Sequence, residues 1–321
     1  MNAQRGACSA GRSKRLFYRR QKVDGGSLFL QQFINGLSLG SIYALIALGY
    51  TMVYGIVTLI NFAHGDIMMM GAYAGYFVLV AFGASGFGFA GALLVAMVFC
   101  GLLGVAIERL AYRPLRNAPR LNSLITAIAV ELILQNMMRV LPFAGPDPKQ
   151  FPALNVPEIN IGPVSIPGIK ALVIIASVLL MLALHVLVNY TKTGKAMRSV
   201  SYDMQASSLM GINVNKTIAI TFAIGSVLAG AGGVLYASAY PQVDPLMGYM
   251  PGLKAFVAAV LGGIGSIPGA MIGGVILGIA ETMTKGYGPS QYADAISFGI
   301  LILILLVKPT GLLGKKRVIK V

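Results

Sequence analysis

Ten apolar segments, separated by short polar stretches, fill most of this chain and restrict it to a small set of folds. They run over residues 28–48, 51–60, 66–83, 87–107, 121–141, 169–189, 218–240, 253–264, 268–284 and 292–308. Only 11% of the 321 residues are charged, whereas soluble domains carry about 25%. Apolar segments in this number predict an all-α polytopic membrane protein with about eight to ten transmembrane helices.

Lysine and arginine residues gather in four stretches between or beside the apolar segments. These stretches are the N-terminal tail 1–26, Arg109/Arg113/Arg116/Arg120, Lys192/Lys195/Arg198/Lys216 and Lys308/Lys315/Lys316/Arg317/Lys320. Basic loops of membrane proteins face the cytoplasm, so the net charge of +15 indicates topology and not nucleic-acid binding. We expect a basic cytoplasmic tail over 1–26, a transmembrane domain over 27–308 and a cytoplasmic C-terminal tail over 309–321.

A polar knot, Asn-Phe-Ala-His-Gly-Asp at 61–66, lies between two apolar runs of unequal length. As a helix, the run 51–60 would be about 15 Å long, whereas a full crossing needs about 20 residues. An even number of crossings must separate successive cytoplasmic stretches. The runs 51–60 and 66–83 are therefore expected to form a broken or re-entrant hairpin that enters and leaves from the outer side.

The same reasoning predicts a second hairpin from 253–264 and 268–284, joined by Gly-Gly-Ile-Gly-Ser-Ile-Pro-Gly at 262–269. The chain then divides into two similar four-segment units, 28–107 and 218–308. Broken helices in membranes line cavities or permeation routes. The candidate substrate pathway therefore consists of the residues at the two tips, Asn61, His64, Gly65, Asp66, Gly262, Gly263, Gly265 and Ser266.

Ionisable side chains are rare inside the apolar segments, where each one is costly and is a candidate for function. They are His64, Asp66, Glu131, His185, Lys254 and Glu281. Asp66 either lines a pathway or caps the helix that begins there, while Lys254 can extend outward to polar surroundings. Glu131 and Gln135 share one helix face. They and Glu281 either join helices or line the pathway, and we favour contacts between helices.

No catalytic or nucleotide-binding motif is present in the sequence. The nearest approach to a phosphate loop, Thr193-Gly194-Lys195-Ala196, lacks the upstream glycine and the Ser or Thr after lysine. Cys8 and Cys100 lie in a basic tail and an apolar segment, so they do not resemble a metal pair. We predict that the chain is not an enzyme, binds no metal or cofactor, and depends on another subunit for energy if it pumps.

The stretch 190–217 is too polar to span a membrane. It contains a helix-like run from Gly194 to Met210, and Gly211 is expected to end that helix. Such a helix is suited to insertion into a cytosolic partner, with Ala206 and Ser207 on the presented face. The alternative is an interfacial helix that lies on membrane lipid.

Four sequence blocks carry a family resemblance. They are GLSLGSIYALIALGYTMVYGIVTLINFAHGDIMMMGAY at 36–73, IERLAYRPLR at 107–116, GKAMRSVSYDMQASSLMGINVNKTIAITF at 194–222 and LKAFVAAVLGGIGSIPGAMIGGVILGIAE at 253–281. Over nearly all of the chain beyond the N-terminal tail, the sequence resembles the LivH-type permease. This permease is one of two membrane subunits of ABC importers for branched-chain amino acids.

The resemblance implies a bacterial inner-membrane permease that works by alternating access. Its implied partners are a second homologous permease, two cytosolic ATPases that hold ATP and magnesium, and a periplasmic binding protein that delivers leucine, isoleucine or valine. The loop 194–211 then corresponds to the segment that docks on the ATPases. The candidate coupling residues are Gly194, Arg198, Asp203, Ala206, Ser207 and Gly211.

Several alternatives stay open at this point. Relatives that import urea or short-chain amides share the resemblance. A secondary transporter driven by protons through His64, Asp66 and Glu131 is a different class, and a passive channel is another. ATP dependence of uptake separates the first class from an ABC importer, and conduction by the isolated chain would indicate the second.

Overall fold

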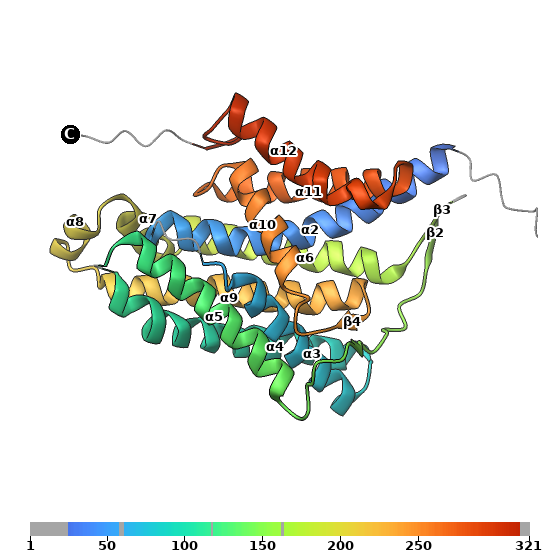
Figure 1. Cartoon of the computed structure of the whole chain (residues 1–321), viewed down its shortest axis with the longest axis horizontal. Helices are drawn as coiled ribbons and strands as arrows, with labels where there is room; N and C mark the ends of the chain where they lie inside the picture. The colour runs from blue at the N-terminus through green and yellow to red at the C-terminus, as the bar shows by residue number, and fades with distance from the viewer. Residues whose placement is uncertain (1–24, 58–60, 117, 162–163, 315–321) are drawn as a thin grey trace, which may run out of the picture.

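The computed structural model describes residues 25–57, 61–116, 118–161 and 164–314, and within them the chain is a bundle of long helices (Figure 1). Eight helices are long and apolar enough to cross a membrane, counting α12 with the short turn before it. They are α2 (Gly25–Val57), α3 (His64–Phe82), α4 (Gly86–Ile107), α5 (Arg120–Val140), α6 (Gly168–Tyr190), α9 (Val214–Ala239), α11 (Ile267–Tyr287) and α12 (Ala293–Val307). The expected all-α polytopic membrane fold is confirmed.

Shorter elements connect these helices and mark the two ends of the bundle. They are the π-helix η1 (Glu108–Tyr112), the 3-10 turns η2 (Arg113–Leu115) and η3 (Ser290–Tyr292), α7 (Lys192–Tyr202), α8 (Met204–Leu209), α10 (Tyr249–Gly262), β1 (Lys149–Gln150), β2 (Ile159–Ile161), β3 (Val164–Ile166) and β4 (Gln242–Val243). β2 pairs with β3, and β1 pairs with β4, both antiparallel. The β2–β3 hairpin lies at one end of the bundle, the hairpin end, and α7 and α8 lie at the other, the α8 end (Figure 1).

The prediction of a first hairpin is wrong, because residues 51–57 form the last turns of α2 and not a separate short helix. α2 has 33 residues, so it is about 50 Å long and exceeds the apolar thickness of a bilayer. The polar knot follows this helix, and His64 already belongs to α3. Residues 58–60, which complete the expected helix 51–60, lie outside the described residues.

This change alters the predicted topology. Three long helices, and not an even number of crossings, separate the start of α2 from the basic stretch that begins at Arg109. α2 therefore begins at the hairpin end, whereas the segment that follows α12 lies at the α8 end (Figure 1). The described part of the chain therefore begins and ends at opposite ends of the bundle, which differs from the expected even number of crossings. The tails 1–24 and 315–321 lie outside the described residues, and their cytoplasmic position stays a prediction.

The second expected hairpin is confirmed. α10 has only 14 residues, and the turn after it leads directly into α11. The Ser266 hydroxyl accepts a hydrogen bond from the Gly269 amide at 3.3 Å and so caps the N-terminus of α11. Because the first unit holds three long helices and the second holds α9 to α12, the two predicted four-segment units are unequal.

Glycine residues bring the central helices into backbone contact. A methyl group on Gly40 of α2 would lie 2.8 Å from Cα of Val275 in α11, and Gly278 packs directly against Gly40. Gly71 of α3 meets Gly230 of α9 in the same way. Small residues at such positions let membrane helices approach closely. α2, α3 and α9 are accordingly the most buried spans, and α12 is the most exposed.

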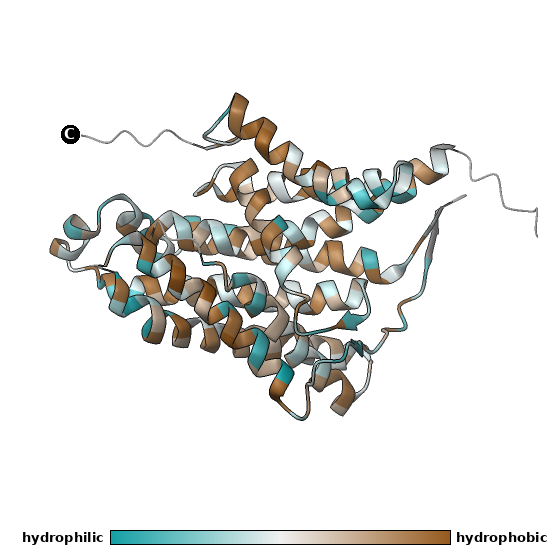
Figure 2. Cartoon of the chain, in the orientation of Figure 1, coloured by the Kyte–Doolittle hydropathy of each residue, from teal (hydrophilic) through white to brown (hydrophobic). Residues whose placement is uncertain are grey.

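Polarity is distributed as this arrangement requires. Figure 2 shows hydrophobic residues along the lengths of the helices and most hydrophilic residues at helix ends and in connecting segments. The proline-rich loop before α6 contains β1, β2 and β3, and its described residues, 142–161 and 164–167, form no helix, as the proline content predicts. β1 joins this loop to the segment that follows α9.

The glycine contacts predict the effect of one added methyl group. Gly40→Ala should destabilise the protein by about 1–3 kcal/mol, because the new methyl group overlaps the α11 backbone. The matched control is Gly299→Ala in α12, where a methyl group meets no atom within 4 Å. The measurement is the midpoint of thermal unfolding of the purified protein in detergent. Equal midpoints for the two variants would contradict the packing argument.

Candidate functional site

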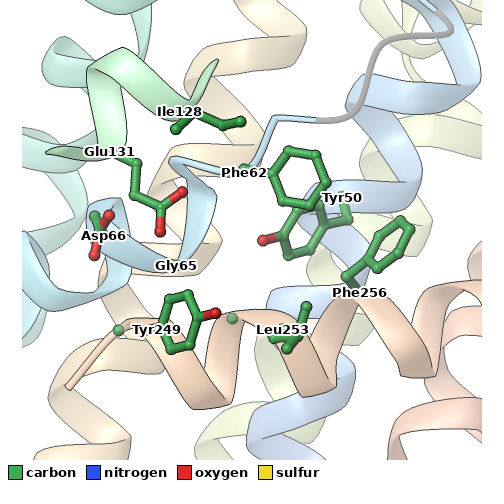
Figure 3. A pocket seen from close by; sticks show the side chains of 11 residues that line it. Tyr50, Phe62, Gly65, Asp66, Ile128, Glu131, Tyr249, Leu253 and Phe256 are labelled. Atoms are coloured by element: carbon green, nitrogen blue, oxygen red, sulfur yellow. The ribbon is translucent and has the colours of Figure 1, made fainter. Parts of the chain in front are cut away.

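A cavity of about 290 Å³ lies between α2, α3, α5 and α10. Figure 3 shows its lining, with Asp66, Glu131 and the ring of Tyr249 on one side and the rings of Tyr50, Phe62 and Phe256 on the other. The lining residues are Tyr50, Phe62, Gly65, Asp66, Ile128, Glu131, Gly248, Tyr249, Gly252, Leu253 and Phe256. The cavity therefore combines one anionic corner with largely apolar walls.

The anionic corner is formed by Asp66 in the first turn of α3 and Glu131 in the middle of α5. The Gln135 amide donates to both Asp66 oxygens, at 3.2 and 3.3 Å, and approaches Glu131 Oε1 at 3.4 Å. Gln135 thus joins α5 to α3, as the predicted contact between helices requires. Glu131, in contrast, lines the cavity.

The apolar walls come from side chains of α2, α10 and the segment before α3. The rings of Tyr50 and Phe256 have centroids 5.9 Å apart, and those of Phe62 and Phe256 are 6.2 Å apart. Ile128 of α5 and Leu253 of α10 complete the apolar lining. Aromatic faces and aliphatic groups of this kind favour an uncharged hydrocarbon group in the same space.

Glycine residues form the floor where α3 meets α10. A methyl group on Gly252 would lie 2.7 Å from Cα of Gly65, and one on Gly65 would overlap the carbonyl of Gly248. The backbones therefore touch, and no side chain intrudes from these three positions. The predicted pathway residue Gly65 has this role, and Asp66 follows it at the cavity edge.

The other two residues of the first tip lie beside the cavity and not in its lining. Asn61 is buried, and its Oδ1 accepts a hydrogen bond from the Tyr112 hydroxyl at 2.8 Å. His64 is also buried, and its ring meets the edge of Tyr50 with centroids 4.6 Å apart. Tyr112 lies in the π-helix after α4 and was not selected from the sequence, because a tyrosine near a helix end carries no distinctive signal.

The second tip is separate from the cavity. α10 touches the cavity with its first turns, and Gly262 lies ten residues beyond Gly252, which is about 15 Å along a helix. Gly263 and Gly265 adopt positive φ angles in the turn, and Ser266 caps α11. The amide of Leu313 donates to the Gly262 carbonyl at 2.9 Å. A pathway role for this tip stays a prediction.

A network of charges joins four helices on the other side of α10. The Lys254 ammonium lies 2.8 Å from Glu281 and 2.7 Å from Asp294, and the Lys285 ammonium lies 2.6 Å from Glu281. The Tyr43 hydroxyl donates to Glu281 at 2.9 Å. Only 6% of the Lys254 side chain is exposed, so its expected outward extension is wrong. Glu281 joins helices, as predicted.

The predicted coupling segment consists of two helices and not one. Thr191 caps α7, whose Gly194 fits against the last carbonyls of α6, and Arg198 donates to the Val188 carbonyl. Asp203 ends α7 and accepts from the amides of the first turn of α8. Gly211 ends α8 with a φ of 81°, a conformation that side chains rarely adopt. The helix end at Gly211 is confirmed.

The face that this segment exposes differs from the prediction. Ser207 is buried and shares a 2.8 Å hydrogen bond with Ser199 of α7, so it is not presented outward. Ala206 is exposed. The large exposed residues are Tyr202, Leu209 and Met210, which are 97%, 89% and 85% exposed. Apolar groups this exposed are suited to contact with a partner protein or with lipid.

The described residues contain no group of three or more His, Cys, Asp or Glu side chains that could hold a metal ion. At the cavity, the carboxylates of Asp66 and Glu131 form a pair with the Gln135 amide between them. A bundle of membrane-spanning helices with a cavity of this kind is the architecture of a membrane permease.

Comparison with known proteins identifies the family. Residues 32–305 match the family described as the permease component of the branched-chain amino acid transport system, and the chain belongs to it. It is 46% identical to the high-affinity branched-chain amino acid transport permease LivH of Escherichia coli K12, over 91% of this chain and 98% of the relative. It is 42% identical to BraD of Pseudomonas aeruginosa, which has the same description, over the same shares. No solved structure matches the chain.

The charge network predicts unequal effects for its two lysines. Lys254→Met removes the buried cation between two carboxylates and should destabilise the protein by about 3 kcal/mol. Lys285→Met is the matched control, because 46% of that side chain is exposed and such pairs contribute about 0–1 kcal/mol. Thermal unfolding of the purified variants measures the difference. If Lys285→Met were the more damaging change, the proposed position of Lys254 at the centre of the network would be wrong.

Proposed function

We propose that this chain is the permease subunit through which an ABC importer moves leucine, isoleucine or valine across the bacterial inner membrane. The observation that carries this proposal is the 46% identity to a high-affinity branched-chain amino acid permease over 98% of that relative. The cavity supports the same substrate class, because it offers apolar walls beside an anionic corner. Neutral urea or amides would gain less from two carboxylates than a substrate with an ammonium group.

The proposed partners supply what this chain lacks. Its sequence has no phosphate loop, so we infer that two cytosolic ATPases bind ATP and magnesium. A second homologous permease completes the membrane unit, and a periplasmic protein delivers the amino acid. In this arrangement the α8 end faces the cytosol and the loop 142–168 faces the periplasm, which agrees with the basic residues between α6 and α9.

Coupling is proposed to begin at the exposed apolar residues of α7 and α8. A route from them to the cavity is supported by a chain of contacts. Arg116 donates to Asn215 of the first turn of α9 at 2.6 Å and also pairs with Glu108 of η1. From the same π-helix, the Tyr112 hydroxyl holds Asn61, four residues before Gly65 at the cavity floor. A shift of α8 against its ATPase therefore moves elements that border the cavity.

Alternating access follows from this arrangement. α10 is the shortest helix at the cavity, and its first turns touch α3 through glycines. A small displacement between α3 and α10 changes the shape of the cavity, because α10 carries Leu253 and Phe256 in its lining. We propose that ATP binding and hydrolysis drive this displacement and open the cavity alternately to the two sides.

Uptake measurements test the proposed function. Cells that lack their own high-affinity leucine permease should regain leucine uptake when this chain is produced with its ATPases, second permease and binding protein. Uptake should stop when ATP is depleted, and the purified chain alone should neither hydrolyse ATP nor conduct leucine. Uptake that survives ATP depletion but is lost with an uncoupler would instead indicate a proton-driven transporter.

The exposed apolar residues of α8 give a prediction about assembly. Replacing Leu209 and Met210 together by serine should release the ATPases from the purified complex or leave ATP hydrolysis without transport, because apolar contact area is lost. Tyr190→Ser is the control, since Tyr190 is exposed at the same end of the bundle but lies outside α7 and α8. The measurement is the amount of ATPase retained in size-exclusion chromatography. Full retention together with normal uptake would show that coupling occurs elsewhere.

A further inference from the structure

The two carboxylates at the cavity, buried Asp66 and half-buried Glu131, differ from the buried carboxylates of Glu108 and Glu281. Glu108 and Glu281 each form a salt bridge with a basic side chain. Within the described residues, Asp66 and Glu131 form no salt bridge, and their recorded side-chain partner is the amide of Gln135. Their position between membrane-spanning helices makes this arrangement unusual, because anions there are normally paired.

The single amide of Gln135 does not fill the hydrogen-bonding capacity of the two carboxylates in the anionic corner. A carboxylate pair offers about eight lone-pair sites, whereas the Gln135 amide supplies two N–H groups. Asp66 gains some support from its place in the first turn of α3, where the helix dipole favours an anion. Glu131 has no such support in the middle of α5. What the corner lacks is a positive charge with several N–H donors, which is the chemistry of a primary ammonium group.

The remainder of the cavity defines the rest of the ligand. Its volume of about 290 Å³ lies near the lower limit of small-molecule sites, about 300–1,000 Å³. The rings of Tyr50, Phe62 and Phe256 face this space opposite the carboxylates (Figure 3). They suit a compact hydrocarbon group. The described lining contains no lysine or arginine, so a ligand carboxylate would have no cationic partner there.

We propose that this cavity is a transit site that holds the substrate by its α-ammonium group between Asp66 and Glu131, with the aliphatic side chain against the aromatic wall. This inference rests on the proposed function and names the groups that select the substrate within the permease. Glu131 is the more diagnostic of the two carboxylates, since it has no role at a helix end. The site recognises the ammonium and the hydrocarbon group and is indifferent to the substrate carboxylate.

Direct binding to the purified permease–ATPase complex, without the periplasmic protein, tests this site. The wild-type complex should bind radiolabelled leucine, and Glu131→Gln should weaken binding about tenfold or more, because a hydrogen bond between charged groups is lost. Asp66→Asn, which keeps one acceptor oxygen and removes the charge, should act in the same direction. Glu158→Gln is the matched control, being the same chemical change in the loop 142–168.

Competition on the unaltered complex provides a second test that does not depend on the folding of a variant. Leucinamide, which keeps the ammonium group and loses the carboxylate, should displace leucine. Isocaproate, which keeps the hydrocarbon chain and lacks the ammonium group, should not. The proposal is overturned by an absence of leucine binding to the wild-type complex, by unchanged binding in Glu131→Gln, or by equal competition from isocaproate. If ATP-dependent leucine uptake persists in any of these cases, the proposed function stands and the transit site alone is wrong.

Discussion

Backbone contact between helices along α2 is the constraint on which the rest of this bundle depends. In a bilayer the lipid chains are as apolar as the helices, so association relies on van der Waals contact and on hydrogen bonds. Gly40 and Gly278 supply this contact with α11, and Gly49 and Gly225 supply it with α9. Because α2 is held on two sides, the helices that surround it are held too. The cavity lies beside this fixed core, next to α5, which packs chiefly against α3 and η1.

The two charged clusters on either side of α10 show how the same residue types serve different ends. Glu281 pairs with Lys254 and Lys285 and accepts a hydrogen bond from the Tyr43 hydroxyl, so its charge is neutralised by contacts that join helices. At the cavity, Asp66 and Glu131 share one amide donor within the described residues. The first cluster pairs its charges internally although it too borders a cavity, of about 290 Å³, and the second leaves charge available to a ligand. α10 thus separates a cluster of ion pairs from a pair of carboxylates that form no ion pair within the described residues.

Much of the fold was predictable because hydropathy reports directly on burial in a membrane. The spans, the short α10 and the helix end at Gly211 all follow from local sequence. The separate helix 51–60 was wrong because Tyr50 and Thr51 lower the hydropathy of a helix that is in fact buried in protein. Local sequence patterns also fail to predict the surroundings of a side chain when its partners lie far away in the sequence. Lys254 is held by carboxylates of α11 and α12.

The site was predictable only in part. Asp66 and Glu131 stand out because ionisable groups are rare in apolar segments, and both prove to line one cavity. Tyr50, Phe62 and Phe256 do not stand out, because aromatic residues are ordinary members of such segments. The face of α8 also depends on tertiary packing, since the bond between Ser199 and Ser207 decides which side turns outward.

The pairing of β1 with β4 connects the long outer loop to the cavity. β1 belongs to the long loop 142–168, and its partner β4 ends at Val243, only five residues before Gly248 at the cavity floor. Because the connection is this short, a movement of the β1–β4 pair has few residues through which it could be absorbed before α10. We expect a partner that displaces the loop to displace the floor of the cavity as well, from the end opposite to α8. The cavity thus lies between two contact regions: the loop that carries β1 at one end of the bundle, and α7 and α8 at the other.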